Sequence, residues 1–270
     1  NRTARSLAQQ DVRSLAVALP SFTAPFQNEL LKGIRAYLKE IEHDLLICDL
    51  GSHDQEASLR KFLNRGAVRG LLLCGLPVTD DLAEDLAGGP SPCVMVGAHH
   101  PLLDCWDWDD EGGAERAVRH LIKQGHKHIA MISSGISSPS QHQRIAGYKA
   151  AMATAGIPLG NDWIVAGNSQ YHGGFSEEDG QEAMETIIER FPECTAVFCS
   201  SDVQAIGAMA ALRRVGKRIP EDMAIVGYDD IKTSRFLGLS SVDQQMQAIG
   251  RAAAECLYLR VSSSAPSAPS

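Results

Sequence analysis

The chain has 270 residues, enough for one large domain or two of ordinary size. Its net charge of -8 argues against a nucleic-acid surface, because such a surface needs a basic patch. No apolar run approaches the roughly 18 residues of a membrane span, and no basic start followed by an apolar segment indicates a signal peptide. The seven cysteines are odd in number and lie mostly in apolar runs. We therefore interpret them as buried thiols of a reducing, cytoplasmic compartment.

Short apolar runs alternate with helical segments along most of the chain. Residues 1–14 are polar and rich in helix formers, and we expect a short helix and a linker there. The expected strands are residues 15–19, 44–50, 70–74, 93–96, 128–132, 163–166, 196–199 and 224–226, with a short strand inside the irregular section 99–110. The expected helices are residues 26–41, 55–63, 80–86, 113–123, 143–155, 178–190 and 245–259, together with the segment between Asp202 and Gly216.

This alternation predicts an α/β fold with parallel sheets that helices cover on both faces. About nine strands are expected, and two sheets of four to six strands fit the chain length better than one sheet. The rhythm of loop, helix and strand restarts near residues 124–128, so we place a domain boundary there. The final segment 263–270 is a low-complexity run of Ser, Ala and Pro that we expect to be disordered.

The segment of residues 196–230 has the pattern of a strand, a helix and a second strand, and both strands end in acid. Asp202 follows the first strand and Asp229 follows the second. Ligands of open parallel sheets lie beyond the carboxyl ends of the strands, so both carboxylates are candidate ligand contacts. An alternative is that Asp202 only caps its helix. The two roles are compatible, because a capping carboxylate keeps its second oxygen for a ligand hydroxyl.

Further polar side chains lie near the predicted strand ends. Asp109 and Asp110 follow a W-D-W segment, Arg144 opens a helix, and Gln244 precedes the last helix. Carboxylates and a planar guanidinium in one cleft suit hydrogen bonding to vicinal hydroxyl groups. The aromatic side chains that could stack on a ligand ring are Phe22, Phe26, Trp106, Trp108 and Phe175. Singly, each acid is explained as a cap or a surface charge, but together these groups predict a site for a small polar molecule.

The signatures of common enzyme classes do not occur in the sequence. There is no P-loop, no G-x-G-x-x-G after the first strand and no G-x-S-x-G nucleophile elbow. His126 and His128 would share one face of a strand, but zinc would need further Cys or His ligands at fixed spacing. We therefore expect no catalytic residues, no metal and no cofactor. An enzyme that uses Asp202 and Asp229 as acid and base is the remaining enzymatic alternative.

Several longer segments together resemble one protein family. In chain order they are N-R-T-A-R-S-L-A, T-A-P-F-Q-N-E-L-L-K-G-I, R-H-L-I-K-Q-G-H-K-H-I-A-M-I, Q-R-I-A-G-Y-K-A-A-M, F-S-E-E-D-G-Q-E-A-M, A-V-F-C-S-S-D-V-Q-A-I-G-A and I-P-E-D-M-A-I-V-G-Y-D-D. With these motifs the chain resembles the effector-binding core of the lactose-repressor (LacI) family, whose fold is that of type I periplasmic sugar-binding proteins. The resemblance covers nearly the whole chain.

The resemblance implies two α/β lobes that are joined by three crossovers and hold an effector between them. The first lobe would comprise residues 12–124 with 245–262, the second residues 125–244, and residues 1–11 would be the end of a hinge. The positions that the resemblance assigns to the effector pocket are Arg144, Asp202, Asp229 and Gln244 as polar contacts, Phe26 and Gln27 on the first helix, Phe175 as a stacking ring, and Asp109 in the family's Asp-Asn pair.

In function, the resemblance implies the effector-binding and dimerising core of a transcriptional regulator. A small polar ligand, a sugar or a sugar derivative, would shift the population between two lobe arrangements. In the homodimer this shift would change the spacing of hinge residues 3–9, and with it the affinity of a helix-turn-helix, absent from this chain, for operator DNA. Arg2 and Arg5 at the hinge end could reach phosphate. The alternative is a solute-binding protein of a sugar transporter, which has the same fold and no DNA partner.

The chain also departs from the family pattern. Ser201 stands where such repressors often have Asn, which leaves the particular sugar open. Residues 168–173 look like an insertion at the mouth of the cleft, and W-D-W-D-D is an unusual approach to the crossover. The family's last strand is missing after the Ser/Pro tail.

Overall fold

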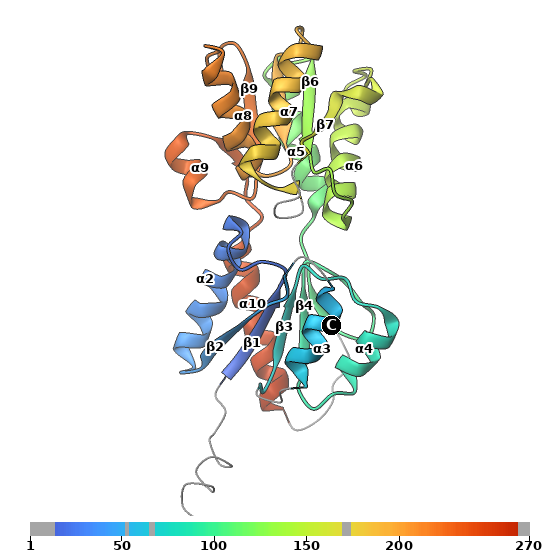
Figure 1. The fold of residues 1–270 in the computed structure, drawn as a ribbon, viewed down its shortest axis with the longest axis vertical. Helices are drawn as coiled ribbons and strands as arrows, with labels where there is room; N and C mark the ends of the chain where they lie inside the picture. Colours follow the sequence, from blue (N-terminus) through green and yellow to red (C-terminus); the bar gives the residue numbers. More distant parts are fainter. Residues whose placement is uncertain (1–13, 52–53, 65–67, 169–173, 264–270) are drawn as a thin grey trace, which may run out of the picture. The chain divides into compact units, whose positions relative to one another are not determined.

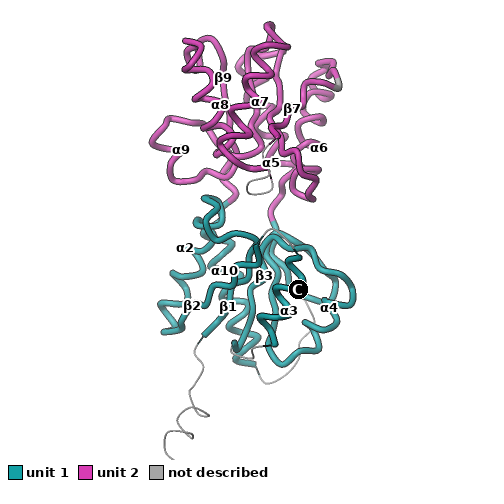
Figure 2. Tube along the Cα trace, viewed as in Figure 1, with its two compact units in different colours: residues 1–107, 245–270 teal, residues 108–244 magenta. Residues whose placement is uncertain are grey.

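Two five-stranded parallel sheets organise the part of the chain that the computed structural model describes (Figure 1). The described residues are 14–51, 54–64, 68–168 and 174–263. The chain divides into two compact units (Figure 2), of which unit 1 comprises Asn1–Asp107 with Gln245–Ser270 and unit 2 comprises Trp108–Gln244. The prediction of an α/β fold with two doubly wound parallel sheets is confirmed.

Some of the expected features fall outside the described residues. These are the hinge end at 1–11 with Arg2 and Arg5, the tail 263–270 except Ser263, and the expected insertion at 168–173 except Asn168. They remain predictions.

The sheet of unit 1 has the strand order β2-β1-β3-β4-β5, and all of its neighbouring strands pair in parallel. Its strands are β1 (Ser14–Leu19), β2 (Asp44–Asp49), β3 (Leu71–Cys74), β4 (Cys93–Val96) and β5 (Asp104–Trp106). Its helices are α2 (Pro25–Glu40), α3 (Gln55–Leu63), α4 (Asp80–Ala87) and α10 (Met246–Ser262). The central strands are continuous apolar runs, because both of their faces are buried under helices.

The two faces of this sheet carry different helices. Ala16 and Leu73 point to the face that α3 and α4 cover, where Leu59 and Leu82 complete the core. Helices α2 and α10 pack against each other and contact strands β2, β3 and β4. Their axes come close at Gly33, where an added Cβ would overlap the main chain of α10. Glycine is therefore required at that crossing.

The sheet of unit 2 has the order β10-β9-β8-β6-β7, again with parallel pairs throughout. Its strands are β6 (Ile129–Ser133), β7 (Ile164–Ala166), β8 (Ala196–Cys199), β9 (Ala224–Tyr228) and β10 (Ser240–Val242). Its helices are α5 (Asp110–Lys123), α6 (Pro139–Thr154), α7 (Glu177–Arg190), α8 (Asp202–Arg214) and α9 (Lys232–Leu237), with a 3-10 turn at Asn161–Trp163. In a parallel sheet, all of these strands present their carboxyl ends at one edge.

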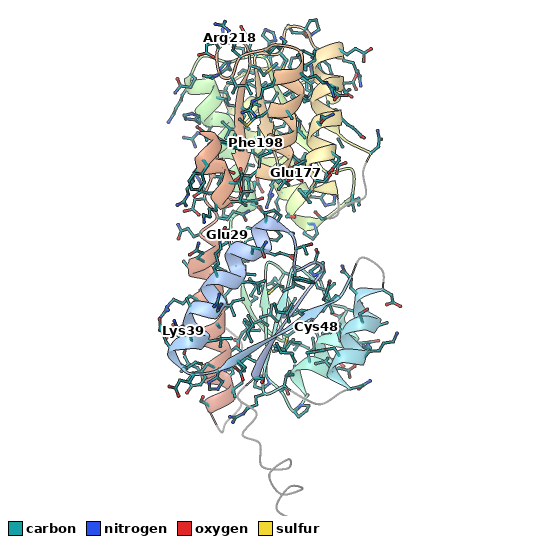
Figure 3. All side chains as sticks on the ribbon, turned by 60° about the vertical axis from the view of Figure 1, so that its left-hand side comes forward. Glu29, Lys39, Cys48, Glu177, Phe198 and Arg218 are labelled. Atoms are coloured by element: carbon teal, nitrogen blue, oxygen red, sulfur yellow. The ribbon has the colours of Figure 1, made fainter. Side chains whose placement is uncertain are left out.

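Alternate residues of each strand in unit 2 enter two separate cores. Val197 and Ile132 pack with α7 and α8, whereas Phe198 and Met131 pack with α5 and α6. Phe198 is fully buried, and Figure 3 shows its side chain inside the unit. Because helices cover both faces of this sheet, a ligand can bind only at the edges of the sheet or at the loops after the strands.

The first unit boundary differs from the expected one near residue 124. Helix α5 belongs to unit 2, which begins at Trp108. The reason is packing: the apolar face of α5, including Val118 and Leu121, lies in one core with Tyr148 of α6 and Tyr228 of β9. The second boundary lies between residues 244 and 245.

Serine residues are the N-caps of three helices in unit 2. Ser138, Ser176 and Ser201 each accept a hydrogen bond from the backbone N–H three residues further along. The alternative that Asp202 caps α8 is therefore wrong, because Ser201 accepts from the N–H of Gln204 and Asp202 is the first residue of the helix.

Candidate functional site

The candidate site lies beyond the carboxyl end of β9. The backbone leaves this strand through Asp229 and Asp230, whose φ angles are +112° and +49°. Positive φ is uncommon outside glycine, and such strained residues cluster at ligand sites. The turn leaves the Asp229 side chain only 7% exposed, although it follows the strand end.

Arg144 is the cation of the site. It lies in the second turn of α6, which begins at Pro139 rather than at the expected residue 143. Its Nε donates to Asp110 Oδ1 at 2.8 Å, and one terminal nitrogen donates to the carbonyl of Ser200. The same nitrogen lies 3.7 Å from Asp229 Oδ1, and the guanidinium carbon stands 4.0 Å from the centre of the Tyr228 ring. Arg144 is thus fixed by its neighbours and pairs first with Asp110.

Asp110, which the sequence prediction passed over in favour of Asp109, is the buried acid of this pair. It is 3% exposed, and its second oxygen accepts a hydrogen bond from Trp108 Nε1 at 3.1 Å. Asp109 is exposed and caps α5 by accepting from the N–H of Gly112 at 2.8 Å. The sequence does not distinguish the two acids, because each is followed three residues later by a glycine. The assignment of Asp109 to the effector stays a prediction.

Asp202 lies in the same cluster, but both of its carboxylate oxygens accept hydrogen bonds from protein groups. Oδ2 accepts from the Ile231 N–H at 2.9 Å and from the Ser234 hydroxyl at 2.6 Å, and Oδ1 accepts from the Ser241 hydroxyl at 2.7 Å. Burial raises the pKa of this carboxyl more than the three donors lower it. Asp202 therefore ties α8 to α9 and β10, and its contact with the effector stays a prediction.

Gln244 completes the polar group. Its Nε2 donates to Asp229 Oδ1, and its Oε1 is buried without a hydrogen-bond partner in the described structure. The other buried side-chain atom in this condition, within the described residues, is Oε1 of Gln27 on α2 of unit 1. Leaving such an atom unpaired costs about 1–3 kcal/mol. Both residues were among the predicted effector contacts.

The predicted aromatic contacts lie in both units. In unit 2, the ring of Phe175 is half-buried and lies 6.0 Å from the Arg144 guanidinium. In unit 1, Phe26 is half-buried in the first turn of α2, and Phe22 is exposed in the loop before it. Of the predicted residues, the structure brings together Arg144, Asp202, Asp229, Gln244 and Phe175 within unit 2.

Burial raises the pKa of the Asp229 carboxyl to about 8, although Arg144 lowers it. The physical reason is that Arg144 lies closer to Asp110 than to Asp229, so the desolvation of Asp229 is only partly offset. An unfolded Asp has a pKa of about 3.9. Between these two pH values the folded state holds a proton that the unfolded state has lost.

Asp229→Asn is expected to flatten the pH dependence of stability. The stabilisation that depends on this proton is complete below about pH 4 and is lost as the pH rises through about 8, by up to about 1.4 kcal/mol per pH unit. Asn has no proton to lose, so the variant should show a smaller fall in the free energy of unfolding. Urea unfolding at several pH values between about 5 and 8 measures this. The exposed control Asp162→Asn should keep the wild-type slope, and an unchanged slope in Asp229→Asn would show that Asp229 holds no such proton.

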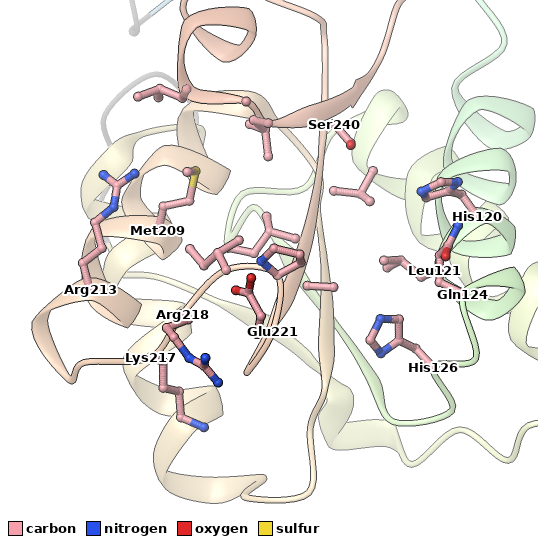
Figure 4. A pocket seen from close by; sticks show the side chains of 18 residues that line it. His120, Leu121, Gln124, His126, Met209, Arg213, Lys217, Arg218, Glu221 and Ser240 are labelled. Atoms are coloured by element: carbon pink, nitrogen blue, oxygen red, sulfur yellow. The ribbon is translucent and has the colours of Figure 1, made fainter.

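A separate groove of about 860 Å³ begins at the amino end of β9, away from Asp229 (Figure 4). Its walls come from the start of β9, the loop before that strand, the chain around the ends of α5 and α8, and the residues that lead into β10. Arg213, Lys217 and Arg218 give it a basic rim, with Glu221 among them. The groove is therefore distinct from the predicted site in both position and charge.

Among the described residues, no group of three or more His, Cys, Asp or Glu side chains is arranged to hold a metal ion. No helix in this part of the chain is long and apolar enough to cross a membrane.

Comparisons with known proteins give one family match and several similar transcriptional repressors. Residues 118–270 match the model of the periplasmic binding protein-like domain family. The transcriptional repressor PurR of Haemophilus influenzae (strain PittEE) is 30% identical over 267 residues, which cover 96% of this chain and 76% of that protein. PurR of Vibrio vulnificus (strain CMCP6) is also 30% identical, over 96% of this chain and 77% of that protein.

Solved structures are similar over almost the whole chain. The transcriptional regulator CelR in complex with cellobiose has a TM-score of 0.82 and 27% identity, covering 99% of this chain and 84% of that one. A LacI-family regulator of Enterococcus faecium with bound ribose has a TM-score of 0.80 and 27% identity, covering 92% and 90%.

The chain belongs to the LacI family of transcriptional regulators. This LacI-family chain is the effector-binding core of such a regulator, as the resemblance implied. The curated relatives are repressors, so a regulator fits better than the transporter protein that was the alternative. The polar cluster of unit 2 contains Arg144, Asp202, Asp229 and Gln244, and their contact with an effector stays a prediction.

Proposed function

We propose that this LacI-family core binds a sugar or sugar derivative beyond the carboxyl end of β9. Arg144, Asp229 and Gln244 would contact the ligand through hydrogen bonds, and Phe175 would stack on its ring. Phe22, Phe26 and Gln27 of unit 1 remain predicted contacts of the effector. The site has no catalytic role in this proposal and needs no cofactor.

The observation that carries the proposal is the unpaired amide oxygen of Gln244. A buried acceptor without a donor is unfavourable unless a ligand supplies the missing hydrogen bond. A sugar hydroxyl is a suitable donor, and the neighbouring Asp229, protonated below its pKa of about 8, can donate a hydrogen bond to a vicinal hydroxyl. The cellobiose and ribose complexes of similar regulators add support for a sugar.

We further propose that the core acts as a cytoplasmic homodimer that controls an N-terminal helix-turn-helix on operator DNA. The repressor relatives support the DNA partner. Exposed apolar side chains support self-association: Phe236 on α9 is 81% exposed, and Leu46 and Ile47 lie exposed on the edge strand β2. Ligand binding would favour one of two arrangements of the core and so change operator affinity.

Gln244→Met is expected to weaken effector binding about tenfold, because the loss of one buried hydrogen bond costs roughly 1–2 kcal/mol. The effector is first found by thermal shift against ribose, cellobiose, other common sugars and nucleosides, since a ligand of the folded state raises the midpoint of unfolding. The affinity of the compound found is then measured by calorimetry. Gln181→Met is the matched control, because Gln181 bonds to Glu185 on α7, and it should bind like the wild type.

Two results would contradict the proposal. One is a panel in which no compound shifts the unfolding midpoint of the wild-type protein. The other is a ligand whose affinity is the same in wild type and Gln244→Met, since that ligand would bind elsewhere.

A further inference from the structure

The groove of Figure 4 carries positive charge on a chain whose net charge is -8. Arg213, Lys217 and Arg218 line it, and Glu221 is the single carboxylate among the described residues that do so. The dipole at the end of helix α8 is equivalent to only about half a negative charge, so it does not neutralise three cations. The groove therefore keeps a surplus of positive charge that attracts an anion.

The hydrogen bonds of the structure show which of these cations are available to a ligand. Arg218 is held by Asp222, whose two carboxylate oxygens each accept a hydrogen bond from its guanidinium at 3.0 Å. The side chains of Arg213 and Lys217 form no hydrogen bond and no ion pair with the residues that the structure describes. Two of the three cations can therefore bind an anion without breaking an existing contact.

The groove runs along an open edge of the sheet. Strand β10 pairs with β9 only from Val226 onward, so within the described chain the start of β9 has no strand beside it on that side. Figure 4 shows His120 and His126 on the α5 side of the groove, across from Lys217. Partly or fully exposed apolar side chains complete the lining: Ile219, Pro220, Leu237 and Leu239.

The size and the lining of the groove together indicate the class of ligand. A volume of about 860 Å³ lies within the range of about 300–1,000 Å³ that is usual for small-molecule sites. An arginine matches two oxygens of a phosphate, and a lysine adds a point charge. The apolar side chains suit a ring on the same molecule, because covering them removes apolar surface from water.

We propose that this groove is a second ligand site and that it binds a nucleotide, which combines a phosphate with a flat ring. Arg213 and Lys217 bind the phosphate, and Leu237 and Leu239 contact the base. The proposal does not depend on the sugar site, because the groove lies at the amino end of β9 and the polar cluster lies beyond its carboxyl end.

The test is calorimetry on the wild-type protein with AMP, GMP, CMP and UMP, with their nucleosides, and with inorganic phosphate. At least one nucleotide should bind, and its nucleoside and inorganic phosphate should each bind at least about tenfold more weakly, because each lacks one part of the ligand. Raising the salt from about 50 to about 200 mM should weaken nucleotide binding, since salt screens exposed charges.

Substitutions in the groove locate the binding. Arg213→Gln and Lys217→Met should each weaken the nucleotide about fivefold, the size expected for one exposed charge pair, whereas Lys217→Arg should bind like the wild type. Lys149→Met is the matched control, because Lys149 is exposed on α6 and does not line the groove. This control should keep the wild-type affinity.

Four results would overturn the proposal. The first is that none of the four nucleotides binds, as when a second copy of the chain covers the groove. The second is an affinity that is the same in wild type, Arg213→Gln and Lys217→Met, which would place the nucleotide elsewhere. The third is a nucleoside or inorganic phosphate that binds as tightly as the nucleotide. The fourth is a tetraglutamate peptide that binds more tightly than any nucleotide and is weakened by the same two variants, since the groove would then dock an acidic peptide.

Discussion

Replacing Arg144 by Met should lower the free energy of unfolding by about 3–5 kcal/mol, the usual cost of breaking a buried ion pair from one side. The side chain is nearly inaccessible, and its removal leaves Asp110 without a cation and the Ser200 carbonyl without its donor. Effector binding should be lost in the same variant, because Arg144 also orders the surroundings of Asp229. Urea unfolding and calorimetry measure the two effects.

Two further variants test the physical reason. Arg190→Met is the matched control, since Arg190 is half-exposed and lies 3.4 Å from the exposed Asp162, and its loss should cost less than about 1 kcal/mol. The double variant Arg144→Met with Asp110→Asn should be less destabilised than the sum of the two single changes, because it leaves no unpaired charge. If the losses of the two single variants add up to that of the double variant, then Arg144 and Asp110 do not stabilise each other.

The second large effect is expected from adding one methyl group between two helices. Gly207 of α8 lies so close to α7 that a Cβ would overlap the carbonyl oxygen of Glu177, and Gly180 of α7 faces the carbonyl of Gln204 in the same way. Alanine normally stabilises a helix by roughly 1 kcal/mol over glycine. Here Gly207→Ala should instead destabilise by about 2–3 kcal/mol, because main-chain atoms cannot move aside as side chains can.

Gly88→Ala serves as the control for this prediction. Gly88 ends α4 with a φ of -85°, and a Cβ there would be 3.3 Å from the carbonyl of Glu84, which a small shift relieves. Thermal and urea unfolding should show a change within about 0.5 kcal/mol. If Gly207→Ala is equally mild, then α7 and α8 are not packed by direct backbone contact.

Most of the secondary structure follows from local pattern. The strands from β1 to β9, apart from β5 in the irregular section 99–110, appear where short apolar runs are bounded by loops, and the long helices appear where apolar residues recur at helical spacing. Helix α9 and strand β10 fall in the stretch expected to be irregular, because Lys232–Leu237 and Ser240–Val242 are too short to show a period. Their structure depends on contacts with α8, which include the hydrogen bonds to Asp202.

Some residues of the candidate site could also be predicted from the sequence, and others could not. Asp229 could be found from the sequence because it follows a predicted strand end and lies in a family motif, and Gln244 because it precedes the last helix and falls on a position that the resemblance assigns to the effector. The choice between Asp109 and Asp110 could not, because it depends on Arg144, which is 34 residues from Asp110. The role of Asp202 likewise depends on Ser241, 39 residues away.

The sequence by itself therefore determined the α/β class, the two parallel sheets, the family resemblance and the end of the sheet at which a ligand is expected. These properties depend on residues that are near one another along the chain. The tertiary structure decided that α5 joins unit 2, that Arg144 is paired with Asp110, and that the amide oxygen of Gln244 is buried without a partner among the described residues. The reason is that a buried polar group is defined by its partners, and folding brings these partners together from distant parts of the chain.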